Sequence, residues 1–409
     1  MADLTIKPQA GSSNKVIIQD QGGRVMLQTE QQGLTLTSHL VSSSDPTVSS
    51  NPVTGVGTKW INSSTGVEFI CVDATGGANI WKHTGMGTSI PNFQVEYLVI
   101  AGGGSGAGRH YNGGGGAGGY RCSYASELSG GKMPTEEKWT AALSTTYMVK
   151  VGAGATRPGN NISGYRGNNS YLKCQQTDPN NTPDIIAIFG GPGMGDNWTT
   201  GEVTATVLYG GSSGGGRGVD DSYGIQIADP IQGSMGGKAV AYTDTSGWHG
   251  GSGGGGAGGT GYNNPANNND GGNGGPGLSS SITGVATWRG GGGGGGAWQG
   301  STGGLGGGYG SFNTAHAQKA GGGDGSANST IPSTLNGIAN TGGGGGGISG
   351  YSVPANGGAG GSGVVIIRYP SARTVSSVSG GLTTSSLNTT DGSYKYTVFS
   401  AGIGTFVFT

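Results

Sequence analysis

Two runs of glycine decide how this chain folds: GGGGGGG at residues 290–296 and GGGGGG at residues 342–347. They lie within a glycine-saturated stretch that covers residues 102–363. Each glycine loses more backbone freedom on folding than any other residue, and it brings no side chain to bury. The stretch is therefore either disordered, or glycine is itself the element that packs.

The composition favours a folded domain over a disordered linker. Glycine makes up 96 of the 409 residues, against a usual share of about 7%. Disordered chains are poor in aromatic residues and carry a high net charge, whereas this chain has 16 Tyr, 7 Trp and 7 Phe and a net charge of −1. Apolar residues cluster at 95–101, 185–189 and 364–369, so strong strand candidates enclose the stretch.

Charge and cysteine content exclude several classes of function. With 20 basic and 21 acidic residues and no long run of either sign, the chain lacks the basic footprint of a nucleic-acid-binding protein. Cys71, Cys122 and Cys174 are too few and too far apart for a disulfide framework or a zinc site. The start has no signal-peptide pattern and apolar runs reach only about seven residues, so we expect synthesis in a cytoplasm and no membrane insertion.

The first 40 residues alternate short apolar bursts with glycine. The bursts lie at residues 4–6, 15–18, 24–27 and 34–36. Short strands with turns about every ten residues are typical of β-structure. Four such strands are too few for a core of their own, so we expect identical chains to intertwine and cover them. Residues 42–52, rich in Ser, Thr and Pro, are predicted to be a linker or part of a shaft.

A denser unit follows at residues 53–84. A polar turn at residues 62–66 joins two alternating strands, and Trp60 and Trp81 are placed to cover one face of this hairpin. The patterns Trp60-Ile61-Asn62, Phe69-Ile70-Cys71 and Ala78-Asn79-Ile80-Trp81 resemble a small module that recurs in bacteriophage tail-fibre proteins. The amino-terminal Leu4-Thr5-Ile6-Lys7-Pro8 likewise resembles the start of trimeric phage fibres.

The boundaries of the glycine stretch carry the same resemblance. Residues 95–104, 113–121 and 360–369 are similar to the opening and closing segments of the glycine-rich domain of phage tail adhesins. This resemblance implies that the glycine runs form parallel polyglycine II helices, which are left-handed with three residues per turn. Packing physics supports the idea, because chains without side chains can place their N–H groups against carbonyls of neighbouring chains. A flexible linker is the alternative, and the apolar residues 185–189 argue against it.

These observations predict a mainly β fold with glycine-rich, polyglycine II-like helices, almost no α-helix, and an elongated trimeric fibre as the assembly. Four domains are expected: an N-terminal β attachment segment at 1–52, a small β-hairpin module at 53–92, the glycine-rich domain with display loops at 93–370, and a C-terminal β-hairpin segment at 371–409. In the last segment we expect residues 394–399 to pair with residues 405–408.

Aromatic and amide residues interrupt the glycine runs, and they are the candidates for recognition. Rigid rings stack on sugar faces or protein side chains at low entropy cost, while amides adapt their hydrogen bonds. The alternative is that these rings cover the glycine lattice, which has no other apolar shell. The receptor-binding candidates are Tyr111, Trp198, Tyr223, Trp248, His249, Tyr262, Trp298, Tyr309 and Phe312.

The sequence offers little for catalysis. The five histidines are scattered without metal-ligand spacing, and no serine nucleophile motif lies between a strand and a helix. The adjacent acids Asp220-Asp221 and Glu136-Glu137 are candidates for a glycosidase pair, but adjacent residues of a strand point to opposite faces. We therefore expect no enzyme activity, no cofactor and no metal site.

The resemblance implies a receptor-binding tail fibre. Such a homotrimer attaches to other phage tail or baseplate proteins through its N-terminal segment and presents loops to a host surface receptor, either polysaccharide or outer-membrane protein. A structural virion fibre without host specificity, such as a collar or capsid decoration, is the alternative. Both interpretations place the protein in the virion after assembly in the host cytoplasm, with no nucleic acid as partner.

Overall fold

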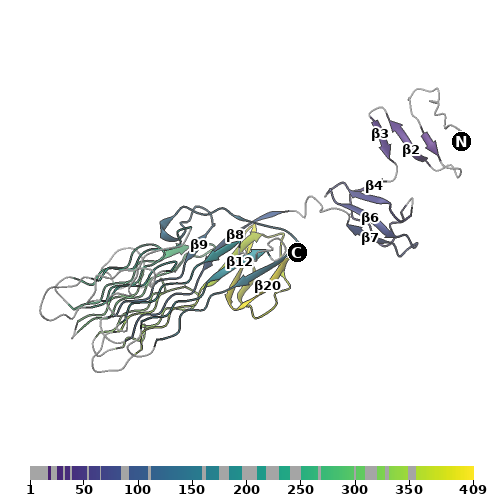
Figure 1. Cartoon of the computed structure of the whole chain (residues 1–409). Helices are drawn as coiled ribbons and strands as arrows, with labels where there is room; N and C mark the ends of the chain where they lie inside the picture. The colour runs from purple at the N-terminus through teal and green to yellow at the C-terminus, as the bar shows by residue number, and fades with distance from the viewer. Residues whose placement is uncertain are drawn as a thin grey trace, which may run out of the picture. The chain divides into compact units, whose positions relative to one another are not determined.

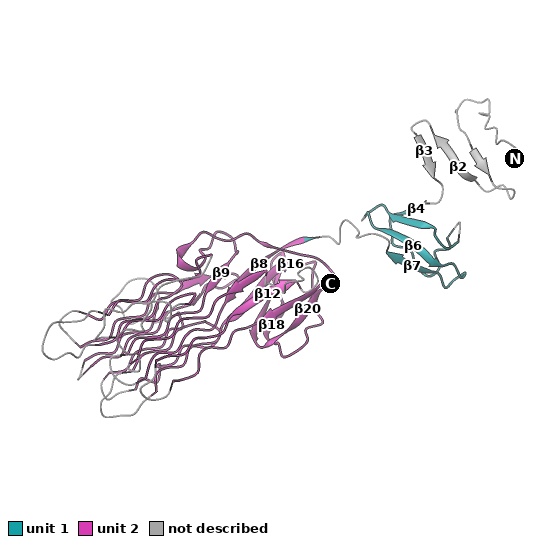
Figure 2. Ribbon diagram, in the orientation of Figure 1, with its two compact units in different colours: residues 1–92 teal, residues 93–409 magenta. Residues whose placement is uncertain are grey.

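The computed structural model divides the chain into two compact units, Met1–Asn92 and Phe93–Thr409 (Figures 1 and 2). Strands dominate it, and the short 3-10 turn Gly130–Lys132 is the one helical element of the described residues, which confirms the predicted β class. The structure describes residues 17–19, 25–30, 33–36, 39–52, 55–64, 66–83, 92–108, 112–158, 163–174, 184–195, 210–217, 230–239, 250–265, 269–298, 301–308, 320–327, 331–348 and 356–409.

The first unit begins with a small antiparallel sheet. Its strands lie in the order β1 (Ile17–Gln19), β2 (Val25–Glu30) and β3 (Gly33–Leu36). They correspond to three of the four predicted apolar bursts, and the burst at residues 4–6 lies outside the described residues. A sheet of this size depends for its stability on an apolar face that packs against a neighbour.

A second sheet of the first unit contains the predicted hairpin. Its strands are, in order, β4 (His39–Ser42), β5 (Lys59–Asn62), β6 (Glu68–Asp73) and β7 (Ile80–His83). β5 and β6 pair antiparallel, and the turn between them is closed by the amide of Asn62, which donates to the carbonyl of Val67 at 2.8 Å. β4 adds to β5 in parallel, so the module starts earlier than residue 53.

The segment between β4 and β5 is fastened to the tryptophans of this sheet. The indole N–H of Trp60 donates to the carbonyl of Ser44 at 2.9 Å, and that of Trp81 to the carbonyl of Ser50 at 3.1 Å. The two rings meet edge to face, with centroids 5.6 Å apart. Residues 42–52 are therefore part of the module, and the predicted linker is wrong because a packed indole N–H requires an acceptor that this segment supplies.

The second unit contains two sheets at one end. The first has the order β10 (Trp139–Ala141), β8 (Phe93–Ile100), β16 (Val364–Pro370), β19 (Tyr394–Ala401) and β18 (Thr383–Asp391), with β9 (Tyr120–Cys122) also paired to β8. The second has the order β13 (Ile185–Ala187), β12 (Ser170–Cys174), β11 (Thr146–Lys150), β20 (Ile403–Phe408) and β17 (Val375–Ser376). A separate ribbon consists of β14 (Leu278–Ser280) and β15 (Thr287–Arg289).

One hydrophobic core joins the two sheets. Alternate residues of β8 point into it, and so do alternate residues of β11 and β20, because side chains alternate across a strand. Its centre is aromatic: the rings of Phe93 and Phe408 lie 5.0 Å apart, and those of Tyr147 and Phe406 lie 5.5 Å apart. Edge-on and tilted contacts of this kind add to the area that the rings bury.

The C-terminal residues complete both sheets. β19 pairs with β16 and β18, whereas β20 pairs with β11 and β17, so the expected pairing of 394–399 with 405–408 is wrong. The chain crosses from one sheet to the other at Gly402, whose φ of +89° suits glycine and few other residues. Residues 371–409 thus belong to the same compact unit as the glycine stretch.

From these sheets the glycine segments run side by side to the opposite end of the second unit (Figure 1). The segment 112–119 illustrates their packing. Its N–H groups donate to three neighbours in rotation, so that every third residue meets the same neighbour: Gly113, Gly116 and Gly119 meet segment 188–194, Gly114 and Ala117 meet 252–255, and Gly115 and Gly118 meet 342–345. Its carbonyls accept from three further segments, within 101–107, 212–215 and 293–296, again at every third residue.

The chain directions within this array are mixed. Segment 112–119 runs antiparallel to segment 188–194 and parallel to segment 252–255, as the order of the bonded residues shows. The approach between segments requires glycine at Gly115, because an added Cβ would overlap the carbonyl oxygen of Gly104. Glycine is therefore the packing element of the stretch and not a sign of disorder.

Candidate recognition surface

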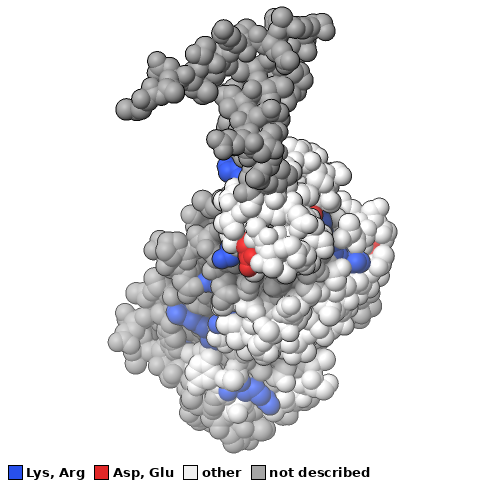
Figure 3. Space-filling view, turned by 90° about the vertical axis from the view of Figure 1, so that its right-hand side faces the viewer, with Lys and Arg blue, Asp and Glu red and all other residues white. Residues whose placement is uncertain are grey.

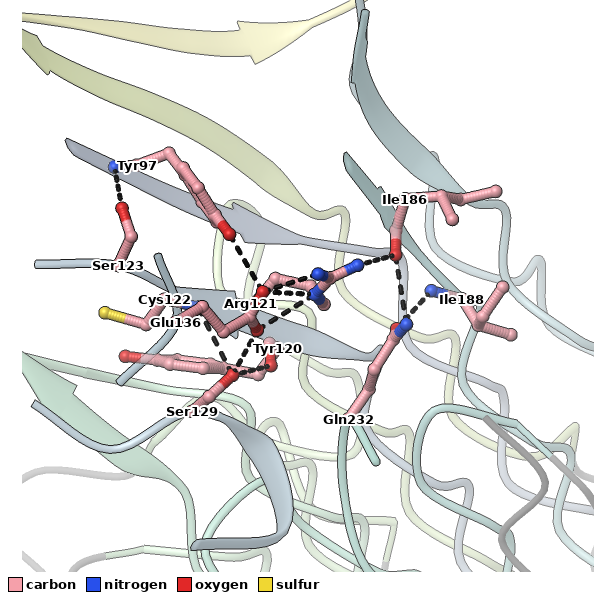
Figure 4. A network of polar contacts seen from close by, with 10 residues as sticks. All are labelled: Tyr97, Tyr120, Arg121, Cys122, Ser123, Ser129, Glu136, Ile186, Ile188 and Gln232. Atoms are coloured by element: carbon pink, nitrogen blue, oxygen red, sulfur yellow. Dashed lines mark hydrogen bonds and ion pairs between the residues drawn. The ribbon is translucent and has the colours of Figure 1, made fainter. Parts of the chain in front are cut away.

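A buried ion pair fixes the joint between the strands and the glycine array (Figure 4). The guanidinium of Arg121 on β9 donates through Nε to both carboxylate oxygens of Glu136, at 2.9 and 2.7 Å. The hydroxyls of Tyr97 and Ser129 donate to the same carboxylate, at 2.8 and 2.6 Å. Glu136 is thus fully used as a structural acceptor, so the geometry gives it no free carboxylate for the acid pair considered with Glu137.

The environment of this pair explains its protonation states. Burial lowers the pKa of Arg121, but hydrogen bonding and the charge of Glu136 outweigh burial, so the pKa is raised overall. Burial, together with the charge of Glu136, raises the pKa of Tyr97 far above its usual value. Both groups therefore stay protonated and keep donating at physiological pH.

Gln232 extends the joint into the array. Its side-chain oxygen accepts from the amide of Ile188 at 2.8 Å, and its side-chain amide donates to the carbonyl of Ile186 at 3.0 Å. Arg121 donates to the same carbonyl at 3.3 Å (Figure 4). At the end of β13, the side chain of Gln232 thus makes the two hydrogen bonds that the backbone of a neighbouring strand would otherwise make.

At the far end, the glycine segments finish in a single hydrogen-bonded layer, which we call the end layer. It is formed by described residues on both sides of segments 109–111, 240–249, 299–300 and 349–355, and by those that precede segments 196–209 and 218–229. Gly296 donates to Asn112 at 2.9 Å, Gly251 to Gly296 at 2.8 Å and Ile348 to the carbonyl of Ala107 at 3.1 Å. Several connections of the chain therefore start from, or return to, one rigid platform.

Seven of the nine recognition candidates lie outside the described residues: Tyr111, Trp198, Tyr223, Trp248, His249, Tyr309 and Phe312. The described residues that precede the first five of them lead into the end layer, whereas the chain after Trp198 and after Tyr223 resumes at the sheet end, where Gly211 donates to Phe189 and Gln232 accepts from Tyr120. The described neighbours of Tyr309 and Phe312 lie at the other end, where Gly308 accepts from Gly277 next to β14 and Ala320 accepts from Gly291 next to β15. The described neighbours of these seven residues therefore fall into two groups.

Tyr262 and Trp298 are described, and both are built into the array. The backbone of Tyr262 donates to Asn273 and accepts from Gly253, each at 2.9 Å, and burial raises the pKa of its half-buried phenol. Trp298 is 4% exposed, and its amide donates to the carbonyl of Asn269 at 2.7 Å. A ring with so little exposed surface mainly packs, which was the alternative considered for these aromatic residues.

Asn112 is a residue of the end layer that the sequence analysis missed. Its side chain is fully buried, and neither its amide nitrogen nor its amide oxygen has a hydrogen-bond partner among the described residues. A buried amide of this kind costs about 1–3 kcal/mol when it is left unbonded. The only signal in the sequence is an Asn beside a glycine run, which occurs many times.

The edge of the array is closed by Asp-Gly and Asn-Gly pairs, which the sequence analysis also missed. Each pair makes two hydrogen bonds to one residue of the neighbouring segment. The side-chain oxygen of the Asp or Asn accepts the backbone N–H of that residue, and the N–H of the following glycine donates to the carbonyl of the same residue. The pairs are Asp270-Gly271 on Thr302, Asn273-Gly274 on Leu305 and Asn336-Gly337 on Ala359, with distances of 2.7–3.0 Å. Such dipeptides are usual signals of turns, and here they replace a missing neighbour.

Charge and metal chemistry give no second candidate among the described residues. On the face drawn in Figure 3, the basic and acidic side chains stand in small separate groups among uncharged residues. Within the described ranges, no group of three or more His, Cys, Asp or Glu residues is arranged to hold a metal ion. No helix in the described part of the chain is long and apolar enough to span a membrane. Asp220-Asp221 lies outside the described residues.

Comparison with known families identifies the array. Residues 83–370 match the model of the family described as "Glycine-rich domain". The chain belongs to this family. The match covers the strands β8 and β16 that enclose the glycine-rich domain as well as the whole array between them. No curated protein and no solved structure matches the chain significantly.

Proposed function

We propose that this chain is the receptor-binding tail fibre of a bacteriophage, and that it attaches the virion to the bacterial surface through the segments that leave the end layer. The end layer is the observation that carries the proposal. Connections that contain five of the aromatic candidates adjoin one platform held by backbone hydrogen bonds. A preorganised platform lowers the entropy that is lost when a partner binds.

We further propose that the glycine segments are polyglycine II helices. The support is the period of three in the hydrogen bonds of segment 112–119, because a helix with three residues per turn directs every third residue at the same neighbour. Six neighbours around one segment also suit such a helix. A crystal structure of the second unit tests this: φ near −75° and ψ near +145° are expected in the segments, whereas a sheet geometry would contradict it.

The proposed assembly is a homotrimer that attaches to other tail or baseplate proteins through its N-terminal segment. The support is physical, since a small sheet such as β1–β3 needs an apolar face that is covered if it is to be stable. Identical chains that intertwine would cover it. Light scattering on the purified full chain tests the assembly, and a stable monomer would rule out the trimer.

The proposed receptor is a surface polysaccharide or an outer-membrane protein, and nucleic acid is not a proposed partner. Aromatic and amide side chains suit sugar faces and protein surfaces alike. Asn112 is proposed to position the displayed segments, because its backbone carbonyl accepts from Gly296 in the end layer and its buried side-chain amide has no partner among the described residues. No catalytic role is proposed, since Glu136 already accepts from Arg121, Tyr97 and Ser129.

Exchange of chain segments tests the function. Residues 240–249, which adjoin the end layer, and residues 309–319, which adjoin the β14–β15 end, are each replaced by the corresponding segment of a fibre with another host. The first exchange is expected to abolish adsorption to the original host, and the second to leave it unchanged. Unchanged adsorption after exchange of every segment at the end layer would instead indicate a structural virion fibre without host specificity.

Competition separates the same alternatives without any variant. The purified chain is added to host cells before infection, and free phage is counted over time. A receptor-binding fibre is expected to slow adsorption in proportion to the sites it covers. A collar or capsid decoration would leave the adsorption rate unchanged.

A further inference from the structure

Polar groups are buried where the β14–β15 ribbon covers the outer face of the first sheet. Tyr120 of β9 and Ser280 of β14 are both fully buried there, beside Cys122. Arg289 of β15 pairs with Leu278, which packs in the same cluster as Tyr120. The next residue, Gly290, abuts the ring of Tyr120, since an added Cβ would lie 3.5 Å from its Cδ2. The guanidinium and the phenol lie close enough to influence each other electrostatically.

Two of these donor atoms lack a hydrogen-bond partner within the described part of the chain. The hydroxyl of Tyr120 and Nη1 of Arg289 are both buried without a hydrogen bond to any described residue. Ser280 lies close enough to the phenol to act against the rise of its pKa, but no hydrogen bond of regular geometry joins the two hydroxyls. Among the described ion pairs, none includes Arg289. Arg289 is half-buried as a residue, but its Nη1 is buried, and a buried donor left unbonded is unfavourable, so this arrangement calls for an acceptor.

The Tyr120 phenol and the Arg289 guanidinium both keep their protons at physiological pH, so both remain hydrogen-bond donors. Burial raises the pKa of the Tyr120 phenol well above its usual value, so the hydroxyl keeps its proton. Burial lowers the pKa of Arg289, but a guanidinium remains charged throughout the physiological range. The nearest carboxylate of the cluster, Glu127, already accepts the amide of Ser281 at 2.7 Å.

We propose that Arg289 and Tyr120 together bind a small monovalent anion, which is chloride in ordinary saline solution. One negative charge matches the single guanidinium, and the phenol supplies a second donor to the same ion. Glu127 disfavours a divalent anion such as sulfate by repulsion. The site lies at the sheet end of the second unit, so it is independent of the proposed recognition at the end layer.

Thermal unfolding of the full chain tests the site. The melting temperature is measured at constant ionic strength while sodium chloride replaces sodium gluconate. Chloride at about 10–100 times its dissociation constant is expected to raise it by about 2–4 °C. Arg289→Gln is expected to abolish this rise, and Arg373→Gln, which changes an arginine stacked on Phe93, is expected to retain it. An equal response of both variants to chloride would overturn the proposal.

Crystals soaked in bromide give a second readout that does not depend on a variant that folds. An anomalous peak between Nη1 of Arg289 and the hydroxyl of Tyr120 is expected in the unaltered protein. Tyr120→Phe keeps the ring and removes one donor, so it is expected to lower the occupancy of that peak. Ordered water at this place in bromide, with no anomalous signal, would overturn the proposal.

Discussion

The backbone of Leu305 is hydrogen-bonded on both sides, by the side chain of Asn273 and by the backbone amide of Gly274. The Asn273 oxygen accepts the N–H of Leu305 at 2.8 Å, and Gly274 donates to the carbonyl of Leu305 at 2.8 Å. An interior glycine segment obtains such bonds from the backbones of its neighbours, whereas a segment at the edge needs side chains. Edge N–H groups left open would otherwise invite pairing with further chains.

Removal of the Asn273 side chain is expected to break one hydrogen bond at the edge of the array. Asn273→Ala leaves the amide of Leu305 without its acceptor, which is expected to cost about 0.5–1.5 kcal/mol. Hydrogen exchange by mass spectrometry is the measurement, and faster exchange at Leu305 is the expected result. Asn356→Ala, which alters an exposed side chain, is the control and is expected to leave exchange at Leu305 unchanged. Equal exchange in both variants would contradict the role of Asn273.

A methyl group inside the array is expected to destabilise it. Gly115→Ala places a Cβ against the carbonyl oxygen of Gly104, and overpacking of this kind costs about 1–3 kcal/mol or more. Thermal unfolding of the second unit is the measurement. Gly381→Ala is the matched control, since its Cβ would lie 3.7 Å from the nearest atom, the carbonyl oxygen of Ile403. Equal melting temperatures for the two variants would contradict the idea that glycine is the packing element.

The joint between strands and array is expected to depend on Glu136. Glu136→Gln leaves the mostly buried guanidinium of Arg121 without its counter-charge, which costs about 3–5 kcal/mol. Glu137→Gln, at the exposed neighbouring position, is expected to change stability by less than about 0.5 kcal/mol. Chemical denaturation of both variants is the measurement, and similar midpoints would show that the network contributes little.

Stability is expected to fall at alkaline pH. Burial raises the pKa of Tyr369 to about 12, and it also raises the pKa of Cys122 to about 12. A phenol whose pKa is higher in the folded state favours folding fully below its unfolded pKa of about 10, and this contribution is lost as pH rises through 12.

The slope of stability against pH checks this assignment. Unfolding free energies are measured between pH 8 and about 12 for the unaltered chain and for Tyr369→Phe. The variant loses the hydrogen bonds of Tyr369 to Asn388 and Thr397, so it is less stable at neutral pH. Its decline between pH 10 and about 12 is expected to be shallower, and an unchanged slope would assign the effect to other groups.

Some elements of the fold could be predicted from the sequence, and others could not. The apolar clusters at 95–101 and 364–369 predict β8 and β16, because each strand is buried along most of its length by its own side chains. The same reasoning fails at residues 42–52, where the partners are the distant indoles of Trp60 and Trp81. It also fails at residues 394–408, because two adjacent strands that look like a hairpin are shared between two sheets.

For the candidate surface, the sequence names residue types but not their places. Trp298 and Tyr262 have the composition of a recognition loop, and the structure builds both into the array. Asn112 and the Asn-Gly pairs carry no distinctive pattern, since asparagine beside glycine is frequent in this chain. Their roles depend on which segment lies beside them, and that is a property of the tertiary structure.

The glycine runs at 290–296 and 342–347 by themselves determine that the backbone must pack without side chains, because nothing else in these runs can exclude water or fill space. They do not determine which run lies beside which, since every glycine is equivalent to its neighbour in sequence. The tertiary structure decides this through the strands at the base, such as β8 and β16, whose apolar faces fix the register of the first segments. Side chains at the edge then decide where the array stops.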